Sequence, residues 1–241
     1  MDKDSHGFAQ MNTDQIRAVF FDVDFTLIYP GPTFQAEGYR QACAASGIEV
    51  DPARFEHATA ASSFILDEVE EQIYNHDLFV HYTASIIEHM GGRGPNVVAV
   101  ARRIYDQWAV NHHFEMYDDA APVLRGLQER GLKVGVISNS HRSLDAFREH
   151  FSLTGLIHVS VSSSEHGYMK PHRSIFDAAL ERAGVQAAES LMVGDSLKHD
   201  VEGALKAGMR AVLLRRSGEV PAGLPAGVPV IQTLAQLDQL L

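Results

Sequence analysis

The chain has 241 residues, of which 45% are hydrophobic and 21% charged, so it is long enough to bury a sizeable core. Its formal net charge of -11 disfavours general nucleic-acid binding, because that affinity depends mostly on Lys and Arg contacts with phosphates. The single cysteine, Cys43, excludes an internal disulfide, and no apolar stretch approaches the roughly 20 residues that span a bilayer. We therefore expect a cytoplasmic protein without a membrane partner, either a monomer or a homodimer.

The first predicted strand, residues 16–22, follows a tail (1–14) that has no periodicity and is expected to be loose. Its apolar run is nearly continuous, which is typical of a parallel strand buried on both faces. Two acids, Asp22 and Asp24, come where this strand should end. Ligands bind at the carboxyl ends of such strands, and a cation such as Mg²⁺ would compensate the repulsion between the two carboxylates.

The next segment is predicted to be helical throughout. Two prolines and a glycine within 29–32 preclude regular structure and suggest a linker. Apolar residues then recur at helical spacing, which predicts four helices at 33–47, 51–74, 77–91 and 96–111. We expect these helices to form a separate bundle with linkers near 28–33 and 112–117.

Strands and helices alternate in the rest of the chain. The predicted helices are 119–130, 142–150, 172–184, 199–207 and one from 234, and the predicted strands are 133–137, 157–162, 190–193, 211–214 and 228–231. This alternation predicts an α/β fold with a doubly wound parallel sheet. The expected domains are an α/β core formed by 15–30 and 114–241, and an inserted four-helix cap at 31–113.

Polar residues also follow other predicted strands: Ser138 and Asn139, then Lys170 in a loop, then Asp195 and Asp200. Each alone is typical of a turn, a helix cap or a solvated loop. Because parallel strands end at one edge of a sheet, we expect these side chains to meet Asp22 and Asp24 there. A nucleophile, hydroxyl and amide donors, a cation and metal-binding acids together favour phosphoryl transfer.

These motifs resemble those of the haloacid dehalogenase superfamily, on its phosphatase side. All four occur in the family's order, and the helical segment stands where the family's cap is inserted. The residues that carry the resemblance are Asp22-Val23-Asp24-Phe25-Thr26, Ser138-Asn139, Lys170-Pro171, and Gly194-Asp195-Ser196-Leu197-Lys198-His199-Asp200 followed by Gly203-Ala204 and Ala207-Gly208-Met209.

The resemblance implies a Mg²⁺-dependent phosphatase acting on a small phosphorylated metabolite. Asp22 would be the nucleophile that forms an aspartyl-phosphate, and Asp24 would be the general acid and then the base. The Asp22 carboxylate, the Asp24 backbone carbonyl and Asp195 would hold Mg²⁺.

The resemblance also implies the phosphate-binding and supporting residues. Ser138, the Asn139 backbone amide and Lys170 would bind the phosphate. Asp200 would orient Lys170 or a metal-bound water, and Thr26 would stabilise the turn behind the acidic pair.

Two details of the first motif refine this interpretation. Phe25 stands where many family members have glycine, which leaves the substrate's size open. The acid at Asp24 argues against the dehalogenase branch of the family, because that branch lacks an acid at this position. A phosphomutase remains an alternative, as does a non-enzymatic phosphoaspartate signalling or binding module.

Several aromatic and imidazole side chains have less specific interpretations. His112 and His113 are expected in a surface linker, and His141 in a solvated or capping role although it follows an active-site motif. Tyr105 and Trp108 are expected to pack in the core rather than to form a stacking platform.

Overall fold

The structure is a computed structural model that describes residues 15–67, 69 and 71–241, so the predicted tail lies outside the described residues. Its main feature is a six-stranded sheet with the order β5-β4-β1-β6-β7-β8, in which every neighbouring pair is parallel. The strands are β1 (Ala18–Phe21), β4 (Lys133–Ser138), β5 (Val159–Ser162), β6 (Ser190–Gly194), β7 (Arg210–Leu214) and β8 (Val230–Ile231).

Both faces of the sheet are buried. Val19 and Phe21 of β1 belong to one hydrophobic core, whereas Ala18 and Phe20 belong to the other, because successive side chains of a strand point to opposite faces. The first core includes residues of α6 (Ala120–Glu129), α7 (Leu144–His150) and the 3₁₀ helix η6 (Leu234–Gln239). The second includes residues of α9 (Arg173–Ala183) and α10 (Gly203–Ala207). The predicted doubly wound α/β sheet is confirmed.

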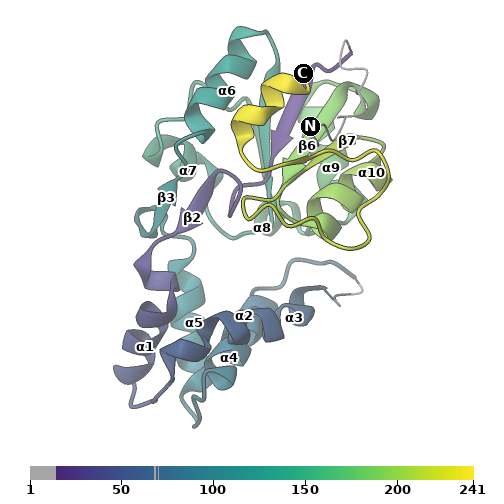
Figure 1. Ribbon diagram of the computed structural model, residues 1–241. Coiled ribbons are helices and arrows are strands. Elements are labelled where there is room, and N and C mark those ends of the chain that lie inside the picture. The colour runs from purple at the N-terminus through teal and green to yellow at the C-terminus, as the bar shows by residue number, and fades with distance from the viewer. Residues whose placement is uncertain (1–14, 68, 70) are drawn as a thin grey trace, which may run out of the picture.

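A group of helices lies between β2 and β3 in the sequence and gathers at one end of the molecule, apart from the sheet (Figure 1). It contains η1 (Pro32–Phe34), α1 (Ala36–Ala44), η2 (Pro52–Arg54), α2 (Phe55–Ser62), α3 (Phe64–Asp67), α4 (His76–His89), α5 (Val97–Gln107) and η3 (Asn111–His113). We call residues 31–113 the cap segment. That it forms a domain of its own stays a prediction.

The two connections of the cap segment pair with each other, contrary to the prediction that 29–32 lacks regular structure. β2 (Ile28–Pro30) and β3 (Phe114–Met116) form a two-stranded antiparallel sheet in which Ile28 faces Met116 and Pro30 faces Phe114. A two-stranded ribbon has only edge strands, where a proline is tolerated. Figure 1 shows this pair between the cap segment and the sheet.

The prediction of a single helix over 51–74 is also wrong, since the last residues of this range pair with a distant loop. Tyr74 N donates to Gly167 O at 2.9 Å, and Met169 N donates to Gln72 O at 2.7 Å. Gln72 has a φ of 52°, which is incompatible with a continuing α-helix. The cap segment is thus hydrogen-bonded to the loop that carries Lys170.

The remaining elements lie close to their predicted positions. The helix predicted for 199–207 begins as a π-helical turn, η5 (Leu197–Glu202), and the last helix is of the 3₁₀ type. Two short helices, α8 (Ser163–His166) and η4 (Ala187–Glu189), were not predicted. No helix within the described part of the chain is long and apolar enough to cross a membrane.

Candidate active site

Asp22 lies at the carboxyl end of β1 in a buried network of charges. The Lys170 Nζ atom donates to Asp22 Oδ1 at 2.6 Å and to Asp200 Oδ1 at 2.7 Å. The side chains of Lys170 and Asp200 are each 2% exposed, and that of Asp22 is 11% exposed. The fold therefore brings Asp22, Lys170 and Asp200 together, as we predicted from the parallel arrangement of the strands.

Acidic groups outnumber the cation in this network. Oxygens of Asp22, Asp195 and Asp200 lie within 4.8 Å of one another. Burial raises the pKa of Asp22 well above its ordinary value; Lys170 opposes this, while the neighbouring carboxylates add to it. Burial and then repulsion by Asp200 raise the pKa of Asp195 to about 7. Burial disfavours a charged Lys170, but Asp200 and Asp22 nevertheless raise its pKa.

This donor set fits a divalent cation that prefers oxygen ligands. Both oxygens of Asp200 already accept hydrogen bonds, one from Lys170 and the other from Ser196 N at 2.9 Å. Asp22 and Asp195 are thus the carboxylates better placed to bind a metal. A cation there would offset the burial and the mutual repulsion that raise the pKa values of Asp22 and Asp195.

Gly194, the last residue of β6, permits Asp200 to come this close. A Cβ at Gly194 would lie 2.2 Å from Asp200 Oδ2, a contact that no side chain can make. The glycine of the fourth motif thus has a packing function beside the acidic cluster.

Asp24 does not join the Lys170 network but is paired with Arg142. Arg142 Nη1 donates to Asp24 Oδ1 at 2.9 Å, and Nη2 donates to Trp108 O at 2.8 Å. The guanidinium carbon lies 4.2 Å from the centre of the Phe114 ring. The Arg142 side chain is fully buried, so this residue connects the first motif to the end of α5 and to β3.

The second motif supports Lys170 through its asparagine side chain. Asn139 Nδ2 donates to Lys170 O at 2.9 Å, and Lys170 N donates to Asn139 Oδ1 at 2.7 Å. Ser138 is 1% exposed, and its Oγ atom has no hydrogen-bond partner among the described residues. Because an unsatisfied buried hydroxyl costs free energy, Ser138 is suited to a ligand oxygen.

Phe25 and Thr26 complete the turn after β1. Thr26 is buried, and its Oγ1 lies 3.5 Å from Asp195 Oδ1. Phe25 has a φ of 65°, the left-handed region that favours glycine, and its side chain is half exposed. A glycine at this position would therefore suit the backbone, and Phe25 adds a ring at the edge of the site.

A cavity of about 460 Å³ lies over these residues. Asp22, Asp24, Lys170 and Asp195 line it from the sheet side. Aromatic side chains line it from the cap segment: Phe34, Tyr39, Phe55, Phe79, Tyr82, Tyr105 and Trp108. Tyr105 and Trp108 pack among these rings, as predicted, and also form part of the cavity wall.

Known proteins share the sequence and the fold of this chain. A family model described as haloacid dehalogenase-like hydrolase matches residues 16–208. The chain belongs to this family. A glyceraldehyde 3-phosphate phosphatase of Methanopyrus kandleri is 31% identical to this hydrolase over 210 residues, which cover 83% of this chain and 84% of the relative.

Solved structures agree with the fold. A HAD phosphatase from Thermococcus onnurineus has a TM-score of 0.64 and 24% identity, covering 93% of this hydrolase and 97% of the other chain. A 2-haloacid dehalogenase from Pseudomonas syringae pv. Tomato DC3000 has a TM-score of 0.62 and 24% identity over the same shares. The fold alone therefore does not choose between phosphatase and dehalogenase chemistry.

Arg142 is the residue of this hydrolase that sequence reasoning missed. It stands three positions after Asn139, and its only signal is a charge at the start of a helix that follows an active-site motif. Arginines in loops are mostly exposed, so the sequence gives no reason to expect one that is buried against Asp24.

Proposed function

We propose that this hydrolase is a Mg²⁺-dependent phosphatase that hydrolyses a small phosphomonoester through an aspartyl-phosphate on Asp22. The observation that carries the proposal is the network of Asp22, Lys170 and Asp200 beneath the cavity. It offers a nucleophile, a cation for the phosphate and an excess of carboxylates in one place. The phosphatase name of the Methanopyrus kandleri relative supports the same class of reaction.

In the first half of the reaction, an Asp22 oxygen attacks phosphorus and the ester oxygen leaves. Lys170 neutralises the phosphate oxygens, and Ser138 donates its unpartnered hydroxyl to one of them. Asp24 gives a proton to the leaving oxygen through Oδ2, since Arg142 binds Oδ1.

In the second half, Asp24 takes a proton from water as that water attacks phosphorus. The bond between phosphorus and the Asp22 oxygen breaks, which releases phosphate and restores the carboxylate. Asp22 and Asp195, with the Asp24 backbone carbonyl, would hold Mg²⁺, which stabilises negative charge on the phosphoryl oxygens. Asp200 keeps Lys170 in position.

The cap segment would close the site. We propose that 31–113 is a cap domain on a core formed by 15–30 and 114–241, and that it limits the access of water during transfer to Asp22. The cavity volume of about 460 Å³ suits a small metabolite.

The test is hydrolysis of an aryl phosphate by wild type, Asp22→Asn and the control Asp238→Asn, whose side chain is 73% exposed. We expect Asp22→Asn to lower turnover by roughly 10³-fold or more with an unchanged circular dichroism spectrum, and the control to retain activity. Chelation of Mg²⁺ should stop the wild-type reaction. Appreciable turnover by Asp22→Asn would assign the nucleophile elsewhere.

A phosphomutase is distinguished by its products. Free phosphate in the amount of substrate consumed supports hydrolysis, whereas an isomerised phosphate ester without release supports the mutase. Complete inertness of the wild type toward a panel of phosphate esters would favour a non-enzymatic binding module.

A further inference from the structure

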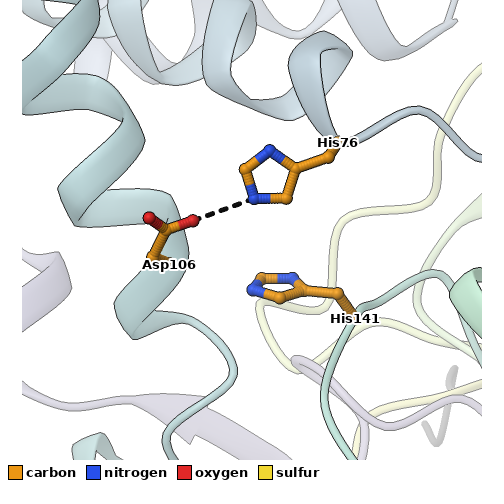
Figure 2. Close-up of side chains that lie close together, drawn as sticks. All are labelled: His76, Asp106 and His141. Carbon is orange, nitrogen blue, oxygen red and sulfur yellow. Dashed lines mark hydrogen bonds and ion pairs between the residues drawn. The ribbon is translucent and has the colours of Figure 1, made fainter.

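Two histidines and an aspartate from separate elements converge outside the cavity. His76 is the first residue of α4, Asp106 lies in the last turn of α5, and His141 lies in the loop between β4 and α7. One ligand atom of each residue lies within 4.8 Å of those of the other two. Figure 2 shows the three side chains pointing toward a common space from two helices of the cap segment and a loop of the sheet.

His141 is the member that the fold leaves unsatisfied. Both of its ring nitrogens are buried, and neither makes a hydrogen bond of ordinary geometry within the described part of the chain, although the Asp106 backbone interacts with the ring. Its ring packs against Tyr105, with centroids 4.4 Å apart, and faces His76 at 5.5 Å. Burial lowers the pKa of His141 and His76 adds to this effect, while Asp106 partly opposes it. A neutral imidazole with an unpartnered nitrogen can bind a metal ion through the lone pair of that nitrogen.

His76 and Asp106 supply the other donors and a route from solvent. His76 Nε2 lies 2.9 Å from Asp106 Oδ1, and their side chains are 33% and 50% exposed. His76 Nδ1 lies 4.0 Å from Asp77 Oδ1, which is too far for a hydrogen bond but adds a second negative charge beside the site. Two cations lie near these residues, and each has a carboxylate partner. Arg102 lies 3.4 Å from His76 Nδ1 and is paired with Asp77 at 2.8 Å, whereas Arg142, which follows His141, is paired with Asp24 at 2.9 Å.

We propose that His76, Asp106 and His141 form a binding site for a divalent transition-metal ion of the Zn²⁺ class, separate from the acidic cluster around Asp22. Two imidazole nitrogens and one carboxylate oxygen are donors that Zn²⁺ accepts, whereas Mg²⁺ prefers oxygen alone. Bonds to such donors are about 2.0–2.2 Å long, so side chains whose ligand atoms lie up to 4.8 Å apart would rotate inward to share one ion. A water would complete four-coordination on the exposed side.

The site would join the cap segment to the sheet. Two ligands come from α4 and α5, and the third precedes Arg142, which binds both Asp24 and Trp108 O. An ion held by all three stabilises the arrangement in which the cap segment covers the cavity. The proposal does not depend on the phosphatase reaction, because metal binding is measured directly.

The experiment is a Zn²⁺ titration by calorimetry in excess Mg²⁺, which is added to compete for the oxygen-rich site around Asp22. Wild type should bind one Zn²⁺, and the affinity should fall at least about tenfold in His141→Ala and in His76→Ala. The matched control is His81→Ala, which removes an exposed histidine from the same helix, α4, and should bind Zn²⁺ as wild type does. Asp195→Asn should also retain it, because Asp195 belongs to the other cluster.

A second readout covers variants that fold poorly. Saturating Zn²⁺ should raise the Tm of wild type and His81→Ala by about 5 °C or more. It should leave the Tm of Asp106→Asn nearly unchanged. This variant should fold normally, because the Asp106 side chain is half exposed. Equal Zn²⁺ affinity in wild type, His76→Ala and His141→Ala would overturn the proposal. So would the absence of Zn²⁺ binding to wild type under these conditions.

Discussion

Replacing Arg142 by methionine isolates the buried ion pair between Arg142 and Asp24. The change keeps much of the side-chain volume but removes the charge, the bond to Asp24 and the bond to Trp108 O. Breaking a buried pair by removing one partner costs about 3–5 kcal/mol. The Asp24 side chain keeps 15% exposure, so water can partly compensate it, and we expect the lower end, about 3 kcal/mol. For a protein of this size, that loss lowers Tm by roughly 6–12 °C.

Urea denaturation of the single variants and of Arg142→Met with Asp24→Asn measures the coupling. The double variant should recover about 1–2 kcal/mol relative to additivity, because no carboxylate is then left without its partner. The control is Arg173→Met, which breaks an exposed pair with Asp177 and should cost less than about 1 kcal/mol. A loss below about 1 kcal/mol in Arg142→Met, or strict additivity in the double variant, would refute the reasoning.

Two further changes test the acidic cluster and the turn after β1. The pKa of Asp195 is raised from its ordinary value of 3.8 to about 7, so the metal-free folded state holds a proton that the unfolded state releases above about pH 4. The unfolding free energy of wild type relative to Asp195→Asn should therefore decrease as pH rises from about 4 to 7. Urea denaturation of both proteins at pH 5 and pH 8 measures this difference. A difference in unfolding free energy that does not change with pH would contradict the prediction. Phe25→Gly should change stability by less than about 1 kcal/mol, since relief of the left-handed backbone offsets the added freedom of the unfolded chain. It should raise kcat/KM more for a bulky than for a small phosphate ester, and equal effects on both would show that the ring does not limit access.

The convergence of Asp22, Lys170, Asp195 and Asp200 could be predicted because it depends on one general property. Parallel strands end at the same edge of the sheet, so residues that follow different strands meet there whatever their separation in sequence. The apolar run of β1 was sufficient to predict burial on both faces. The roles assigned to these residues stay predictions until the variants are assayed.

The features that could not be predicted depend on contacts between distant segments. Residues 72–74 leave the expected helix because they pair with 167–169, which no local pattern indicates. The interpretation of His141 as a solvated or capping residue considered only its neighbours in sequence. Its ring, whose two nitrogens are buried, meets His76 and Tyr105, which come from the cap segment.

The pairing of β2 with β3 has an evolutionary consequence. The chain leaves toward the cap segment and returns from it on adjacent antiparallel strands, which lie only about 4.8 Å apart. A short hairpin turn could therefore join Pro30 to Phe114 without moving either strand or altering the order of the six-stranded sheet. Helical segments of different length and composition could be exchanged at this junction. Such an exchange would leave the residues that follow β1, β4 and β6 in place.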